Sequence, residues 1–273
     1  MIKIKLLQYI ILGIIQGLTE PLPISSSGHV YLFKEIFNTN MFSDTNFEIF
    51  VNFGSFLAIF LIFFSDIKKL VIEFFKFIFS KEEKKKKYQE SFKYCLLVIV
   101  GSIPVGLAGV FFKDTIESFI SVKEIAISLL FTALMLFLVR NSNGKKESKD
   151  ITIKDAIIIG LLQVVALLPG ISRSGTVLVG CLLCKLSKNA SLKYTFMLYF
   201  PVSAAAMLLG VKDLMEVGSL NSLIVPYSVG MLASAVITYF SYKWLSNIVK
   251  NGKLWYFSIY CIIVSIFTFI WFR

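Results

Sequence analysis

Charged residues are scarce in this chain of 273 residues. Asp, Glu, Lys and Arg make up 16% of it, whereas soluble domains carry about 25%. Hydrophobic residue types make up 56%. These proportions exclude an ordinary soluble domain of useful size and indicate a protein that crosses a membrane several times.

Histidine and cysteine are also few. His29 is the single histidine, and all four cysteines lie inside apolar segments: Cys95, Cys181, Cys184 and Cys261. The pair Cys181-Leu-Leu-Cys184 has no further cysteine or histidine beside it in the sequence. We therefore interpret it as apolar packing and not as a metal or redox centre.

The apolar runs predict the membrane helices. A membrane span needs about 20 apolar residues, so the chain has room for roughly six to ten membrane elements. The runs lie at 6–18, 47–64, 92–112, 122–140, 151–168, 174–186, 194–211, 223–242 and 254–272. Two short runs end in polar breaks that contain Pro, Ser and Gly, and each is followed by a second short segment. These two pairs, 6–18 with 28–37 and 151–168 with 174–186, are typical of re-entrant helix–loop–helix elements.

An internal repeat relates the two breaks. When the sequence is shifted by about 147 residues, eight of the twenty positions from 10 to 29 match, including Gly13 with Gly160 and Gln16 with Gln163. Each half then contains one re-entrant pair and three clearer spans. This odd number of crossings predicts an inverted second half. We therefore predict an all-α polytopic membrane protein with a single membrane domain, 1–273, built from inverted repeats at approximately 1–146 and 147–273.

Linker charges predict the orientation. Basic linkers favour the cytoplasmic side, and here they are 65–91, 140–154, 185–193 and 243–253. The linkers 113–121 and 212–222 are near neutral or acidic and are expected outside. The first re-entrant loop then enters from outside and the second from the cytoplasm, and their tips meet near the middle of the membrane. We interpret the formal charge of +11 as a sign of topology and of contact with anionic lipids, not of nucleic acid.

Glu20 is a carboxylate between two strongly apolar runs. A charged group in the middle of a membrane costs a few kcal/mol, so it needs a function or a partner. We interpret Glu20 as a general base or a metal ligand. The alternative is that it pairs with Arg173 only to hold the two loops together.

The hydroxyl groups of the two breaks indicate an anion site. Ser25-Ser26-Ser27-Gly28 precedes one short helix, and Ser172-Arg173-Ser174-Gly175-Thr176 opens the other. Serine caps helix N-termini everywhere, but free N–H groups at a helix start also bind phosphate. Two such termini, together with a guanidinium group, predict a strong site for an anion.

Other polar residues lie near these motifs. His29 is expected to relay a proton or to protonate a leaving oxygen. Gln16 lies one helical turn before Glu20 and is expected to orient it or a water molecule. We interpret Gln163 as structural. Glu48 and Asn52 lie one turn apart at the outer end of a span, and a role in lining the entry is only the alternative interpretation for them.

The two motifs together resemble those of the undecaprenyl pyrophosphate phosphatases, and the similarity runs essentially from end to end. The first motif of that family, (Glu/Gln)-x-x-x-Glu, matches Gln16-x-x-x-Glu20, which is followed by Pro23-x-Ser25-Ser26-Ser27-Gly28-His29. The second, Pro-Gly-x-Ser-Arg-Ser-x-x-Thr, matches Pro169-Gly170-x-Ser172-Arg173-Ser174. The chain departs from the family pattern at two positions. Gln16 stands where some members have glutamate, and Val177 stands where the second motif closes with threonine.

The resemblance implies a multi-pass enzyme of the bacterial cell membrane whose active site opens to the outer face. Such an enzyme removes the terminal phosphate of undecaprenyl diphosphate with the help of Mg²⁺ or Ca²⁺. Its product carries peptidoglycan precursors, and family members can confer bacitracin resistance. The expected partners are the polyprenyl diphosphate and membrane lipids, without nucleic acid, and a homodimer stays open.

The resemblance also implies roles for individual residues. By position, the catalytic residues are Glu20, Ser26, His29 and Arg173, and Glu20 is also the metal ligand. The substrate-binding residues are Gln16, Ser25, Ser27, Ser172, Ser174 and Thr176. Either Ser26 attacks phosphorus with Glu20 or His29 as base, or Glu20 activates a water molecule.

Two other functions compete with this interpretation. Inverted repeats with broken helices are also typical of transporters, so a transporter or flippase of an anionic lipid phosphate is the alternative. Ser27-Gly28-His29 resembles the Ser-Gly-His motif of type-2 phosphatidic acid phosphatases. Their mechanism uses a second histidine as nucleophile, and the single histidine of this chain excludes it.

Overall fold

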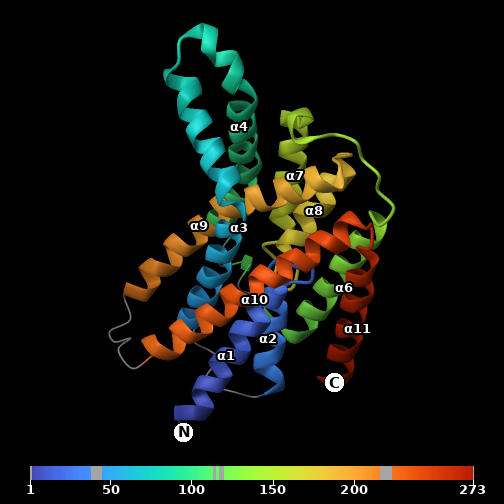
Figure 1. Cartoon of the computed structure of the whole chain (residues 1–273). Coiled ribbons are helices and arrows are strands. Elements are labelled where there is room, and N and C mark those ends of the chain that lie inside the picture. The colour runs from blue at the N-terminus through green and yellow to red at the C-terminus, as the bar shows by residue number, and fades with distance from the viewer. Residues whose placement is uncertain (1, 38–44, 113–114, 117–119, 216–222, 273) are drawn as a thin grey trace.

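The fold is all-helical, as predicted. The computed structural model describes residues 2–37, 45–112, 115–116, 120–215 and 223–272, and within them the only strand-like feature is an isolated bridge between Lys146 and Leu186. Figure 1 shows the arrangement of the helices, which are α1 (Ile2–Thr19), α2 (Ser26–Ile36), α3 (Thr45–Phe79), α4 (Glu82–Phe111), α6 (Val122–Leu138), η2 (Ser148–Asp150, a 3₁₀ helix), α7 (Ile153–Val165), α8 (Arg173–Leu183), α9 (Lys188–Met215), α10 (Ile224–Lys250) and α11 (Trp255–Trp271).

Three described helices are long and apolar enough to span a membrane: Phe47–Phe79 within α3, Glu82–Phe111 and Ile224–Lys250. Shorter apolar helices accompany them at Leu6–Thr19, Arg173–Leu183 and Trp255–Trp271. Large apolar side chains are exposed on these helices, for example Leu61 and Ile263. A surface of this kind requires a lipid environment, and the protein is a membrane protein.

The helices extend beyond the apolar runs that predicted them. The linker expected at 65–91 is a helical hairpin instead, because α3 continues to Phe79 and α4 begins at Glu82. Lysine and glutamate, both good helix formers, are frequent in this stretch, and it contains no proline or glycine that would end a helix. Figure 1 shows the hairpin projecting beyond the other helices.

The helix–loop–helix pairs occur where the sequence predicts them. α1 ends at Thr19 and α2 begins at Ser26, and α7 and α8 are separated in the same way by residues 166–172. Each second helix has a serine N-cap. Ser25 Oγ accepts from the N–H of Gly28 at 3.2 Å, and Ser172 Oγ accepts from that of Gly175 at 3.1 Å. Ser25 adopts a positive φ of 70°, a strained conformation that the surrounding packing must hold in place.

Glycines let the first helix of each pair pack closely against a long helix. A Cβ atom on Gly13 of α1 would lie 2.2 Å from the carbonyl oxygen of Gly230 in α10. A Cβ atom on Gly160 of α7 would lie 2.4 Å from the carbonyl oxygen of Gly101 in α4. Both contacts are between backbones, and small residues are what allow helices in membranes to approach this far.

These contacts predict that glycines differ in how well they tolerate replacement by alanine. Gly13→Ala and Gly160→Ala push a methyl group into a carbonyl oxygen, and we expect each to destabilise the fold by about 1–3 kcal/mol. Gly106→Ala is the control, because a Cβ atom there has no neighbour within 4 Å. Thermal unfolding of the purified variants in detergent measures the effect. Equal melting temperatures for Gly13→Ala and Gly106→Ala would show that the close packing is not needed.

Candidate active site

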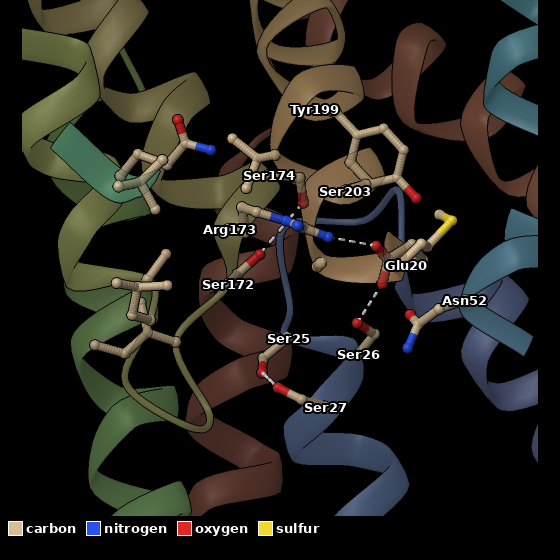
Figure 2. Close-up of a pocket in the computed structure, with 18 of the residues that line it drawn as sticks. Glu20, Ser25, Ser26, Ser27, Asn52, Ser172, Arg173, Ser174, Tyr199 and Ser203 are labelled. Carbon is tan, nitrogen blue, oxygen red and sulfur yellow. Dashed lines mark hydrogen bonds and ion pairs between the residues drawn. The ribbon is translucent and has the colours of Figure 1, made fainter. Parts of the chain in front are cut away.

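A cavity of about 350 Å³ lies where the two helix–loop–helix pairs meet. Figure 2 shows polar side chains from both loops turned toward one another across it. It is lined by Glu20, Ser25, Ser26, Ser27, Ile49, Asn52, Val105, Gln163, Ala166, Leu167, Ile171, Ser172, Arg173, Ser174, Tyr199, Val202, Ser203, Ala206 and Met207. Seven of the ten residues named from the sequence therefore lie in one cavity. The other three, Gln16, His29 and Thr176, are not part of its lining.

Glu20 is the centre of the hydrogen-bond network. It is buried, and Arg173 Nη2 lies 2.8 Å from its Oε1. Its Oε2 accepts from Ser26 Oγ at 2.5 Å and from Gln16 Nε2 at 2.9 Å. Three donors therefore face one carboxylate, and such charge-assisted hydrogen bonds compensate for part of the cost of its burial.

Gln16 links Glu20 to helix α3 through hydrogen bonds. Its Nε2 donates to Glu20 and also to Oδ1 of Asn52 in α3, at 2.7 Å. Asn52 lines the cavity. Glu48, one turn earlier in α3, instead pairs with Lys34 of α2.

The N-termini of α2 and α8 border the cavity. Ser26 and Ser27 are the first residues of α2, Arg173 and Ser174 are the first of α8, and all four belong to the lining. The two loops are joined directly, since Ser174 Oγ donates to the carbonyl oxygen of Leu22 at 3.0 Å. Each helix start carries a partial positive charge, and the two starts with Arg173 make this region suited to an anion.

His29 and Thr176 point elsewhere. The His29 ring lies between the carbonyl oxygen of Ser25, 2.8 Å from Nδ1, and the hydroxyl of Tyr260 in α11, 2.9 Å from Nε2. Thr176 Oγ1 donates to the carbonyl oxygen of Ser172 at 2.7 Å, within its own helix. The structure does not bring either side chain to Glu20, and their expected roles stay predictions.

Two polar residues of α9 also line the cavity and were not predicted. The ring centroid of Tyr199 lies 4.9 Å from Cζ of Arg173, a cation–π contact that fixes the guanidinium group. Ser203 follows one turn later and also lines the cavity. Both lie within the apolar run 194–211, where Ser203 is the one weak signal that the sequence offers.

An apolar groove of about 530 Å³ adjoins the cavity. The cavity and the groove share Ile49 and Met207. The other residues that line the groove are Phe50, Phe53, Phe56, Ala204, Leu208 and Met231. A polar chamber therefore leads into an apolar surface, and together they match a molecule with an anionic head and a hydrocarbon chain.

The ligands for a metal ion in the cavity are oxygen atoms. The described part of the chain contains no group of three or more His, Cys, Asp or Glu side chains that would hold a metal alone. Among the described residues of the lining, Glu20 supplies the one carboxylate, beside Asn52 and the serine hydroxyls. Mg²⁺ is commonly bound by one or two carboxylates together with substrate phosphates and water. The residues present fit a cation whose remaining ligands come from a phosphate-bearing substrate.

Comparison with known proteins identifies the family. Residues 9–267 match the family model described as bacitracin resistance protein BacA. A protein named undecaprenyl-diphosphatase 2 from Bacillus thuringiensis is 42% identical, and the match covers 97% of each chain. The undecaprenyl-diphosphatase of Oceanobacillus iheyensis is 39% identical over 97% of this chain and 96% of its own. Undecaprenyl-diphosphatase 1 of Halalkalibacterium halodurans is 36% identical over 94% and 92%. With a match that spans nearly the whole chain, this protein belongs to the bacitracin resistance protein BacA family.

Proposed function

We propose that this protein is a membrane phosphatase that hydrolyses undecaprenyl diphosphate to undecaprenyl phosphate and inorganic phosphate. This reaction recycles the lipid carrier of peptidoglycan synthesis, and it lowers the lipid diphosphate on which bacitracin acts. The observation that carries the proposal is the contact of Glu20 with Arg173 and Ser26 between two helix N-termini. Relatives that match from end to end are named undecaprenyl-diphosphatases, so the alternative of a pure transporter is not favoured.

The two cavities support a lipid diphosphate as substrate. The polar cavity of about 350 Å³ suits the diphosphate, and the adjoining apolar groove suits the first isoprene units of its chain. The three phenylalanine rings of the groove offer apolar surface beside the head-group site. The rest of a long chain stays in the bilayer, which is the better solvent for it.

The geometry supports Ser26 as nucleophile and Glu20 as its base. Ser26 Oγ already donates to Glu20, the arrangement that activates a hydroxyl for attack. In this route the Ser26 oxygen bonds to the terminal phosphorus, the bridging P–O bond breaks and undecaprenyl phosphate leaves. Glu20 takes the serine proton. It passes this proton to the departing undecaprenyl phosphate and is then free to act as base again. Water attacks the phosphoserine while Glu20 accepts a proton from it, the Ser26 O–P bond breaks, Glu20 returns the proton to the Ser26 oxygen and inorganic phosphate leaves.

Arg173 has two partners in this proposal. In the structure its guanidinium group forms an ion pair with Glu20. An incoming diphosphate offers the guanidinium group a more highly charged partner with matching geometry. When a phosphate group replaces Glu20 as the partner of Arg173, the carboxylate becomes free to accept the serine proton. This happens only when substrate is bound.

The charge of the cavity supports a divalent cation. Glu20 and Arg173 are the charged residues among the described lining, and their charges cancel. A diphosphate therefore enters a site whose fixed positive charge is limited to the two helix starts. Glu20 and Asn52, with the substrate oxygens, would hold Mg²⁺ or Ca²⁺ there, and the cation would neutralise charge as the bond to the leaving group breaks.

We also propose that the chain is one membrane domain of two inverted repeats, 1–146 and 147–273, whose site opens to the outer face of the bacterial membrane. Matched contacts support the repeats. The first helix of each half packs through a glycine against the fourth helix of the other half, in Gly13 with Gly230 and in Gly160 with Gly101. The basic linkers support the orientation, since they fall on one side when the spans are counted.

Replacement of Glu20 by glutamine tests the site. Gln keeps the shape but not the charge, so we expect phosphate release from undecaprenyl diphosphate in detergent to fall by about 10²–10⁴-fold. Asp66→Asn is the control, because Asp66 pairs with Lys193 and does not line the cavity. Full activity of Glu20→Gln would refute the assignment, and a wild-type protein that released no phosphate would refute the function.

The route through Ser26 makes a separate prediction. Because the phosphate is transferred to Ser26 in this route, brief reaction with terminally labelled diphosphate followed by an acid quench should leave label on the wild-type protein. Ser26→Ala should carry none and should lose at least about 10²-fold in turnover. Substantial turnover by Ser26→Ala without protein-bound label would show that Glu20 activates water directly.

Dependence on a cation can be measured in the same assay. Chelation by EDTA should abolish phosphate release because the cavity is electrically neutral without the cation, and added Mg²⁺ or Ca²⁺ should restore it. Thermal unfolding without substrate should change little upon chelation, since the phosphates supply part of the ligand set. Activity that survives exhaustive chelation would show that Arg173 and the helix starts suffice.

A further inference from the structure

Gln163 of α7 is a buried amide whose hydrogen-bonding groups are unused. The residue is 1% exposed, and neither its Nε2 nor its Oε1 has a hydrogen-bond partner among the described residues. It lines the polar cavity, together with Arg173 and Ser174. From the sequence we interpreted Gln163 as structural, but a glutamine with a structural role is expected to form hydrogen bonds within the protein.

An unpaired buried amide is costly. Each donor or acceptor that is left without a partner has lost its hydrogen bonds to water and gained none in return, so a protein gains nothing in stability from keeping a glutamine there. Leucine, of similar volume, would fill the same space without this cost. The amide therefore indicates a partner that arrives from outside the protein.

The sequence repeat provides a comparison within the chain. Gln16 is the counterpart of Gln163 under the shift of about 147 residues, and its amide is fully engaged with Glu20 and Asn52. The position that corresponds to Glu20 in the second half is Leu167, which offers Gln163 no acceptor. The amide of Gln16 thus donates to Glu20, the proposed base, whereas the amide of Gln163 has no partner among the described residues.

The surroundings of Gln163 favour a phosphate as that partner. A small void of about 10 Å³ separates it from Arg173, Ser174 and Tyr199. Arg173 and Ser174 belong to the helix start that is suited to an anion. An amide NH₂ group supplies two donors, which suit phosphate oxygens in the cavity that Gln163 lines.

We propose that Gln163 is a ligand of the substrate diphosphate, and that its amide donates to a phosphate oxygen beside Arg173. This inference rests on the proposed function. Gln163 contributes to binding of the diphosphate in the ground state and in the transition state alike. Its loss therefore weakens affinity and leaves the chemical step in place.

The test measures KM, kcat and melting temperature for Gln163→Leu with undecaprenyl diphosphate in detergent. We expect KM to rise about 10- to 100-fold, as for the loss of a hydrogen bond to a charged group, with little change in kcat. The melting temperature without substrate should stay the same or rise, because an unpaired amide is removed. Gln163→Glu should raise KM further, since its carboxylate repels the diphosphate.

Gln8→Leu is the matched control. The Oε1 of Gln8 in α1 is also buried without a partner among the described residues, but Gln8 does not line the cavity, so its KM should equal that of the wild type. A lower melting temperature for Gln163→Leu with an unchanged KM would make Gln163 structural and overturn the inference. If Gln163→Leu does not fold, a wild-type KM for Gln163→Glu overturns it instead. An inactive wild-type protein would refute the proposed function, whereas an active one with normal KM in the Gln163 variants refutes this inference alone.

Discussion

The ion pair between Arg173 and Glu20 is the interaction on which the site depends. Each residue alone is a charge in the apolar interior, where an unpaired ion costs several kcal/mol. The two come from loops 153 residues apart, and they lie 2.8 Å from each other. Neither loop can therefore keep its position unless the other is folded beside it. The same pair brings together a helix start from each half, so the constraint that closes the fold also creates the anion site.

Close backbone contacts help to hold the scaffold around this pair. In a membrane, lipid chains are as apolar as leucine, so the hydrophobic effect contributes little to helix association. Close contacts at Gly13 and Gly160 replace it and hold the first helix of each pair. Hydroxyl groups add to them: Ser258 and Ser265 of α11 each donate to a backbone carbonyl of α6, at 2.7 Å. Positions that look featureless in the sequence thus fix where the loops meet.

The sequence predicts the helical class, the two breaks and the polar residues that the two loops place in the cavity, because each has a local cause. Apolar runs indicate helices, Pro, Ser and Gly end them, and Glu20 stands out as a charge in an apolar stretch. Features that depend on distant partners were not predictable. The extension of α3 and α4 into the linker was also missed, although its cause is local: residues 65–91 contain no proline or glycine to end a helix, which hydropathy does not register. His29 turns toward Tyr260, 231 residues away, and Tyr199 resembles any aromatic residue of a span until it lies against Arg173.

The two halves of the chain contribute different residues to the site, although an internal sequence repeat relates them. Under the shift of about 147 residues, Ser26 corresponds to Arg173 and Glu20 corresponds to Leu167. The first half therefore carries the acid and the hydroxyl, and the second carries the fixed cation. A symmetric arrangement would place either two carboxylates or two guanidinium groups in one small cavity, and like charges at that separation repel strongly in an apolar surrounding. Divergence of the halves gives a neutral ion pair instead, in which each charge compensates the other.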